Sequence, residues 1–307
     1  MKYLIKRLLE AVPVFLIIIT AVWVMVRFVP GGPFDKERPV SPETMAALNS
    51  YYGLDKPMHV QYLQFLKNLA KGDLGPSYKY NGWSVGEILR EKAAVSLQLG
   101  FCALVIALFF GIALGILSAV FRRGVLGVVF SAASLAGVCL PAMVLGPVLI
   151  LIFSLKLKWF NSMGWNSPAD IILPSITLSL FYVAWISRLT RSGIVAEIQK
   201  PYVRTALAKG VGPAKIFCVH ILRNALEPVI SYLGPAAAGL LTGSFVVESL
   251  FQIPGLGKFF VSSALDNDYT MILGCVMLYA LFILVFNIFS DALLALVNPK
   301  IAKELNK

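Results

Sequence analysis

The sequence is poor in charge, cysteine and histidine, and each shortage excludes a class of protein. Only 14% of its 307 residues are charged, against about 25% in an ordinary soluble domain. Four Cys without a Cys-x-x-Cys pair, and two distant His (His59 and His220), argue against a disulfide scaffold and a zinc site. Apolar residues make up 58% of the chain, which excludes a disordered protein. The composition therefore indicates a polytopic membrane protein.

Sequence motifs of several enzyme classes are also missing. The chain has no Gly-x-x-x-x-Gly-Lys-Ser/Thr loop to hold ATP phosphates, no His-Glu-x-x-His and no Gly-x-Ser-x-Gly. We therefore expect no ATP hydrolysis by this chain alone, and an intramembrane hydrolase is the weakest of the functions considered.

Ionisable residues are rare inside the apolar runs. Arg27, Glu227, Glu248 and Asp291 all fall near the ends of such runs. Carriers driven by ion gradients usually hold charge near the membrane midplane. This placement argues against a self-sufficient secondary transporter or channel, which we keep as the alternative hypothesis.

Six apolar stretches are long enough to cross a membrane as helices, since one crossing takes about 20 residues. They are roughly 9–30, 95–121, 125–155, 171–190, 228–247 and 272–297. The first is followed by no small-x-small cleavage site, so we interpret it as a retained span. The third contains Pro141 and Pro147, which predict a kink, a tilt or a part outside the bilayer. The predicted fold class is all-α, with six transmembrane helices.

Lys and Arg are unevenly divided between the flanks of these spans. With the N-terminus inside, the inner flanks carry 15 Lys and Arg in 56 residues, whereas the short outer loops carry three in 38. Because basic residues gather on the cytoplasmic side, we expect both termini to be cytoplasmic. The same rule explains the net charge of +11 without a nucleic acid partner, and membrane lipid is the expected surrounding.

The outer segment 31–94 predicts a small helical insertion outside the membrane. Its helix signals are Ser41-Pro42-Glu43, the apolar spacing from Pro57 to Lys71, and the capping-box spacing of Ser84 and Glu87. We expect two or three short helices that contact a soluble partner, cover the pathway or act as a structural cap. The chain then divides into an N-terminal tail and first span (1–30), the insertion (31–94) and a transmembrane core (95–307).

A basic loop, 191–227, lies between the fourth and fifth spans and is longer than a turn requires. Residues 192–208 carry apolar residues near helical spacing, and Gly210-Val-Gly-Pro213 then ends that helix. A second helix is expected to start near Ala214 and continue into the fifth span. Two helices meeting at a glycine corner form a shape that fits a groove on a soluble partner. Gly210 permits a positive φ and close approach of that partner.

This corner resembles the EAA loop of the permease subunits of ABC importers. The hallmark of that loop is Glu-Ala-Ala, three residues, Gly and, about nine residues later, Ile-x-Leu-Pro. Here Arg204-Thr205-Ala206 precedes Gly210 at the same spacing, and Ile221-Leu222-Arg223 follows it. The Glu and the Pro are thus replaced, as is typical of the peptide-importer branch, whose motifs 202–210 and 223–226 match.

Further motifs along the chain are similar to the same branch. They lie at 5–9, 30–33, 53–57, 61–62, 72–78, 243–248, 251–257 and 298–300. The resemblance covers nearly the whole chain and is strongest to the first, B-type permease subunit of bacterial oligopeptide and dipeptide importers. Oligopeptide cargo is the preferred expectation.

The resemblance implies a type I ABC importer permease fold in the bacterial inner membrane. It implies a second homologous permease, two ABC ATPase subunits that carry ATP and Mg²⁺, and an extracytoplasmic peptide-binding protein that sets specificity. This chain would bind no cofactor or metal. The residues expected to couple to the ATPase are Arg204, Thr205, Ala206, Ala208, Lys209, Gly210, Gly212 and Pro213. Arg204 and Lys209 have a second interpretation, as charges that only mark the cytoplasmic side.

Three polar residues, Ser244, Glu248 and Asn287, are candidates for the translocation pathway, of which this chain would form half. Each has a second interpretation as a hydrogen-bonding residue between helices. Two small-residue pairs, Gly111-x-x-x-Gly115 and Gly239-x-x-x-Gly243, predict close helix approach within this subunit or against another.

Overall fold

The computed structural model describes residues 2–28, 42–80 and 82–297, and most of them are helical. The longer helices are α1 (Lys2–Arg27), α4 (Val85–Val120), α5 (Val125–Cys139), α7 (Ile172–Ile198), α11 (Glu227–Leu241) and α14 (Tyr269–Val297). The shorter ones are α2 (Pro42–Tyr51), α3 (Met58–Ala70), α6 (Ala142–Leu149), α8 (Pro201–Ala208), α9 (Pro213–Lys215), α10 (Leu222–Ala225), α12 (Phe245–Leu250) and α13 (Leu256–Leu265). Two π-helices, η1 (Ile150–Lys156) and η3 (Ile216–Ile221), and a 3-10 turn, η2 (Pro168–Ile171), complete the set.

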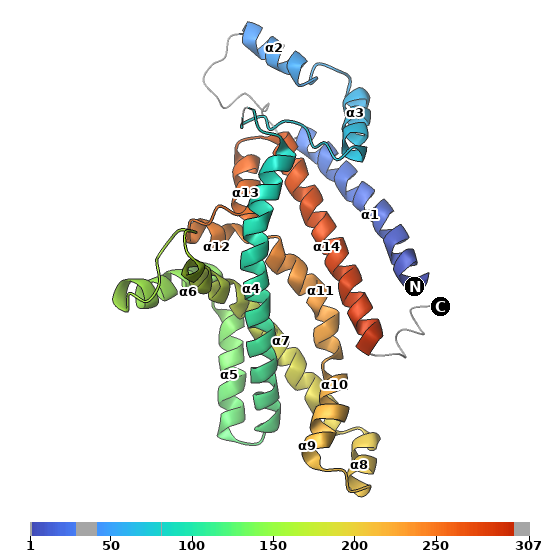
Figure 1. Ribbon diagram of the computed structural model, residues 1–307, viewed down its shortest axis with the longest axis vertical. Helices are drawn as coiled ribbons and strands as arrows, with labels where there is room; N and C mark the ends of the chain where they lie inside the picture. Colours follow the sequence, from blue (N-terminus) through green and yellow to red (C-terminus); the bar gives the residue numbers. More distant parts are fainter. Residues whose placement is uncertain (1, 29–41, 81, 298–307) are drawn as a thin grey trace.

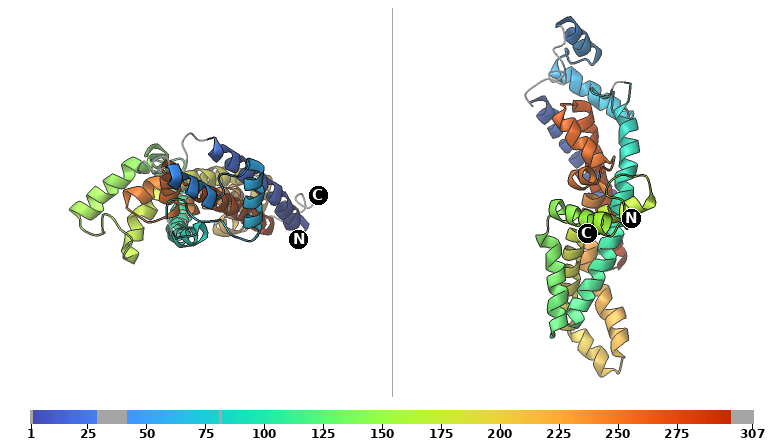
Figure 2. Two further views of the ribbon diagram at one scale, coloured as in Figure 1. Left: turned by 90° about the horizontal axis from the view of Figure 1, so that it is seen from above. Right: turned by 90° about the vertical axis from the view of Figure 1, so that its left-hand side faces the viewer.

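The molecule is elongated, with α2 and α3 at one end and α8 and α9 at the other (Figure 1). The second view in Figure 2 shows the same two ends farthest apart. Long helices run between them, and α1 lies beside α14. Residues 29–41 and 298–307, which include the motifs at 30–33 and 298–300 and the predicted helix start at Ser41, lie outside the described residues.

Five segments are long and apolar enough to span a membrane, and a sixth passes only as a bent pair, among the residues that the structure describes. The five are Arg7–Arg27, Val85–Val120, Pro168–Ile198, Glu227–Leu250 and Tyr269–Leu296. The bent pair, Val125–Cys139 and Ala142–Lys156, changes direction by 106°. Pro141 lies at the break. It explains the break, because proline has no N–H to donate and disfavours helical backbone in the residue before it. The expected kink in the third span is therefore a sharp bend.

Small residues allow α4 to pack closely along α7 and α11. A Cβ atom added to Gly111 would lie 2.8 Å from the Ile186 side chain, and one added to Gly115 would lie 2.5 Å from Thr190. On the same helix, a Cβ atom on Gly100 would lie 2.3 Å from the Leu240 carbonyl oxygen. Such contacts require helix backbones to approach each other directly. The close approach predicted for the first small-residue pair is therefore made within this chain.

The insertion contains two separate short helices, α2 and α3. The third helix signal, at Ser84 and Glu87, does not produce the short helix expected there. Ser84 accepts a hydrogen bond from the Glu87 backbone N–H, and the Glu87 side chain accepts one from Ser84, so the capping box is present. It begins α4, which continues for 36 residues to Val120. The apolar sequence has no proline in this range, so nothing ends the helix after its first turns.

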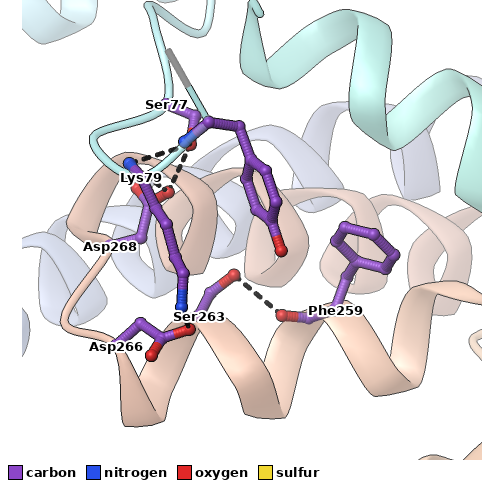
Figure 3. Close-up of polar contacts among 7 residues, drawn as sticks. Ser77, Lys79, Phe259, Ser263, Asp266 and Asp268 are labelled. Carbon is purple, nitrogen blue, oxygen red and sulfur yellow. Dashed lines mark hydrogen bonds and ion pairs between the residues drawn. The ribbon is translucent and has the colours of Figure 1, made fainter.

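A buried carboxylate, Asp268, fastens the loop before α4 to the start of α14 (Figure 3). It accepts hydrogen bonds from the Ser77 hydroxyl and from the backbone N–H of Tyr78, at 3.3 Å, and of Met271, at 3.1 Å. An exposed ion pair, Lys79 with Asp266, lies beside it. The buried contact joins residues about 190 positions apart and holds the insertion against the bundle.

Replacing Asp268 with Ala should weaken this end of the molecule much more than replacing Asp266. The first change leaves several buried donors without an acceptor, which costs about 1–3 kcal/mol. The second removes only an exposed ion pair, worth about 0–1 kcal/mol. Thermal unfolding in detergent and proteolysis of the loop 74–84 measure the difference. Equal effects of Asp268→Ala and Asp266→Ala would contradict this account.

Candidate functional site

The end of the molecule that carries α8 and α9 forms a helical corner, which we call the elbow (residues 199–215) (Figure 1). Its first arm is not the continuous helix expected over 192–208, because α7 ends at Ile198 and α8 starts at Pro201. Lys200 between them is extended, with φ −70° and ψ 146°. The residue before a proline avoids helical backbone, and proline is well suited to the first helical position. The helical part of the elbow is therefore shorter than the sequence pattern suggested.

The tip of the elbow is a turn that only glycine adopts without strain. Gly210 has a φ of +72°, as the sequence predicted, and a Cβ atom there would meet nothing within 4 Å. Gly212 caps α9, and Pro213 takes its first helical position. The backbone at the tip is therefore exposed and accessible to a partner protein.

The residues predicted to couple to a partner lie together on the outer face of the elbow. The exposed ones are Arg204, Thr205, Ala208, Lys209, Gly210, Gly212 and Pro213. Ala206 is half-buried against the hydrophobic cluster beneath the elbow. The structure thus brings these residues onto one surface with two basic groups and little bulk.

The opposite face of the elbow is anchored in the bundle by apolar contacts. Val203 of α8 is buried together with Ile194 on α7 and with Ile216, Ile221 and Ala225 on the segment 216–225 that follows the elbow, which we call the return arm. Burial of an aliphatic side chain of this size contributes about 1.5–3 kcal/mol. The return arm also approaches α7 closely, because a Cβ atom on Gly193 would lie 2.2 Å from the Ala225 carbonyl oxygen. The inner face of the elbow is therefore packed against α7 and the helices that follow the elbow.

A polar brace adds to these apolar contacts. The buried Glu197 accepts a hydrogen bond from the Tyr202 hydroxyl at 2.6 Å and forms an ion pair with Lys200. Tyr202 also donates to the His220 carbonyl oxygen at 3.2 Å and accepts a long, 3.5 Å bond from the Asn224 amide. Burial, with the hydrogen bond to Glu197, raises the pKa of Tyr202 to about 12. Its hydroxyl therefore remains a donor at neutral pH.

This brace was not predicted from the sequence. One signal was available, because Glu197 is the only acidic residue in the strongly basic stretch 188–223. Buried acids need compensating donors, so a single acid among cations at a helix end is a candidate for such a role. The identity of the donors could not be read from the sequence.

Glu248, a predicted pathway residue, is fully buried and holds a loop in place. Its carboxylate accepts hydrogen bonds from the Ser96 hydroxyl at 2.7 Å and from the Lys258 backbone N–H at 2.9 Å. A Cβ atom on Gly255 would lie 2.5 Å from the carboxyl carbon, so the loop wraps directly around the acid. These contacts favour the bracing interpretation for Glu248.

The other two pathway candidates are partly accessible. Ser244 caps α12 and accepts a 3.4 Å hydrogen bond from the Val247 backbone N–H. Asn287 of α14 lies against α11, where a Cβ atom on Gly234 would be 2.8 Å from the Asn287 Oδ1 atom. Ser244 and Glu248 lie one helical turn apart, and the Glu248 backbone N–H donates to the Ser244 carbonyl oxygen at 2.8 Å, whereas Asn287 has a separate contact against α11.

The bundle of apolar helices with its exposed elbow is compatible with a transport permease, and the comparison with known families assigns this class. Family models match the whole length apart from the last residues. "Binding-protein-dependent transport system inner membrane component" matches 111–303, and the corresponding N-terminal family matches 1–110. The chain belongs to this family of inner-membrane transport components. It is therefore a multi-pass, non-catalytic permease subunit.

Individual relatives agree over nearly the full chain. The "Oligopeptide transport system permease protein OppB" of Haemophilus influenzae is 41% identical over 303 residues, which cover 98% of this chain and 99% of that protein. The protein of the same name from Escherichia coli K12 is 39% identical with the same coverage. The "Dipeptide transport system permease protein DppB" of Bacillus subtilis is 39% identical over 300 residues, 98% of this chain and 97% of that protein.

A solved structure supports the fold. The inward-facing MetNI methionine ABC transporter contains a chain that matches with a TM-score of 0.52 and 18% identity. The match covers 69% of this chain and 96% of that one. The type I ABC importer permease fold predicted from the sequence is therefore confirmed. The relatives do not favour the alternative of a self-sufficient transporter or channel.

Removing the hydroxyl of Tyr202 should loosen the elbow without unfolding the bundle. Tyr202→Phe takes one donor from the buried Glu197, which weakens the local brace by about 1–3 kcal/mol. Hydrogen exchange of the amides in 200–213 should become faster, while the amides of α4 keep their rate. The matched control is Ser231→Ala, which removes an exposed hydroxyl bonded only within its own helix. Unchanged exchange in the elbow of Tyr202→Phe would contradict a bracing role.

Proposed function

We propose that this chain is a B-type permease subunit of an ATP-driven oligopeptide importer. In this proposal it pairs with a second homologous permease to form the pathway, and an extracytoplasmic peptide-binding protein delivers the cargo. Two ABC ATPase subunits bind ATP and Mg²⁺. The near full-length similarity to oligopeptide permease proteins supports this choice, with a dipeptide importer as the nearest alternative.

The observation that carries the coupling role is the contrast between the two faces of the elbow. The outer face is exposed and ends in the open turn at Gly210, whereas the inner face is fixed to α7 by Val203 and the Glu197–Tyr202 brace. A partner that binds the outer face therefore displaces α7 together with the elbow, because the elbow is not a flexible loop. ATP-driven closure of the ATPase pair would act on α7 and rock the permease between its inward-open and outward-open states.

The proposed orientation places the elbow and both termini on the cytoplasmic side. The basic flanks support it, because Arg122, Arg123, Arg188 and Arg191 lie toward the elbow end of the chain's spans. The insertion then faces the binding protein's side of the membrane. For the pathway, Ser244 and Asn287 remain the proposed polar residues, and Glu248 supports its wall.

Replacing Gly210 with Glu tests the coupling role. The variant adds an acidic side chain to the proposed docking surface and forces a left-handed backbone that costs about 1–3 kcal/mol. We expect loss of ATPase association and of peptide uptake in the reconstituted complex. Gly72→Glu is the matched control, since Gly72 has a φ of +75° and equally open surroundings at the other end of the molecule. Normal association and uptake by Gly210→Glu would exclude the elbow as the docking site.

The cargo class is tested separately, by competition in the wild-type complex with its binding protein. Unlabelled peptides of four or five residues should inhibit uptake of a labelled pentapeptide, and dipeptides should inhibit it much more weakly. Stronger inhibition by dipeptides would assign the chain to a dipeptide importer and leave the coupling role intact.

A further inference from the structure

Four arginines surround an open hollow of about 620 Å³ near the elbow end of the bundle. Arg122 and Arg123 belong to the turn between α4 and α5, and Arg188 and Arg191 belong to α7. The remaining lining residues are Ser192, Val195 and Gln199. The α7 residues follow helical spacing, so they form one stripe that faces the turn. Two segments more than 60 positions apart in the sequence thus present four positive charges to one space.

This hollow has no negative charge of its own. No acidic residue lines it. Within the described part of the chain, none of the four guanidinium groups makes an ion pair or a hydrogen bond to a protein group. The nearby acid Glu197 is engaged by Lys200 and Tyr202 in the brace. The four like charges around this hollow repel one another, so an anion from outside the chain is the natural partner.

The surroundings of the hollow indicate which anion this is. The outer face of α5, which starts two residues after Arg123, exposes Val125 by 80% and Val128 by 68%. Apolar surface of this kind is stable in lipid and not in water. The Arg188 guanidinium lies 5.4 Å from the ring centre of the partly exposed Trp185, a residue type enriched where hydrocarbon meets water.

The position of the hollow in the molecule agrees with the level of lipid headgroups. The turn between α4 and α5 lies at the elbow end but does not reach as far as α8 and α9 (Figure 1). The arginines therefore lie at the edge of the apolar surface, and the elbow extends farther into the aqueous phase. Basic pockets at this depth bind anionic phospholipids.

We propose that the four-arginine hollow binds the headgroup of an anionic phospholipid, with preference for a headgroup that carries two phosphates, as in cardiolipin. Guanidinium groups pair with phosphate oxygens in a two-bonded geometry, and the acyl chains of the lipid lie along the apolar face of α5. The bound lipid neutralises the arginines and ties the turn at Arg122 to α7, the helix that carries the elbow. This site is additional to the docking surface on the elbow.

The test measures binding of fluorescent cardiolipin to the detergent-purified complex of both permeases and the ATPase subunits. Arg188→Gln combined with Arg191→Gln should weaken binding about 30-fold, since each basic residue near an anionic lipid contributes roughly a fivefold gain. Arg122→Gln combined with Arg123→Gln provides a second variant, changed only in the turn. Arg90→Gln combined with Lys71→Gln removes the same charge at the opposite end of the molecule and should leave the affinity unchanged.

Competitors identify the source of the phosphate. Unlabelled cardiolipin should displace the probe, whereas phosphatidylcholine and inorganic phosphate should not. Displacement by inorganic phosphate at equal concentration would show a site for free anions and overturn the lipid assignment. Unchanged cardiolipin affinity in both arginine double variants would also overturn it. So would loss of ATPase subunits from those variants with lipid affinity retained, because the hollow would then be part of a protein interface.

Discussion

The close approach of α7 to α4 is the contact on which the rest of the structure depends. Gly111 and Gly115 leave no room for a side chain, so the two helices touch near their backbones. Helix α4 begins in the insertion, directly after its cap residue Ser84, and α7 ends at Ile198, where the elbow starts. The contact therefore connects the two ends of the molecule through rigid helices. A displacement of the elbow is transmitted along α7 to the bundle and is not absorbed in a flexible loop.

The few charged side chains that are buried in the described part of this protein are all acidic. The charged residues that are buried in the described part of the chain are Asp170, Glu197, Glu248 and Asp268. Each accepts hydrogen bonds from hydroxyl, amide or backbone groups, which compensate its loss of water. Each also joins segments or fixes a turn. Because these four acids are engaged internally, they do not neutralise the arginines of the hollow, which remain available for an anionic partner.

The elbow combines an open surface with a fixed base. Its tip depends on the positive φ of Gly210, and its base depends on the Glu197–Tyr202 contact and on the buried Val203. An exposed tip without a fixed base would not transmit the movement of a bound partner to α7. A fixed base without an exposed tip would give the partner no surface to bind. The arginine hollow lies beside the same helix, so a lipid bound there would stabilise the helix that the coupling partner moves. The hollow is lined by α7, and the elbow follows directly after α7 in the chain, so the two sites are linked through this helix.

Local sequence alone determined the helical membrane class, the six apolar stretches, the capping box at Ser84 and the positive φ of Gly210. These features depend on neighbouring residues, and their physical causes act over a few positions. Local sequence also contained the break before Pro201, although the apolar spacing of 192–208 concealed it. Only the tertiary structure decided that Ser77 meets Asp268, that Tyr202 meets Glu197 and Asn224, and that Arg122 and Arg191 line one hollow. Those pairings depend on how far helices rotate and slide when they pack, which no single segment specifies.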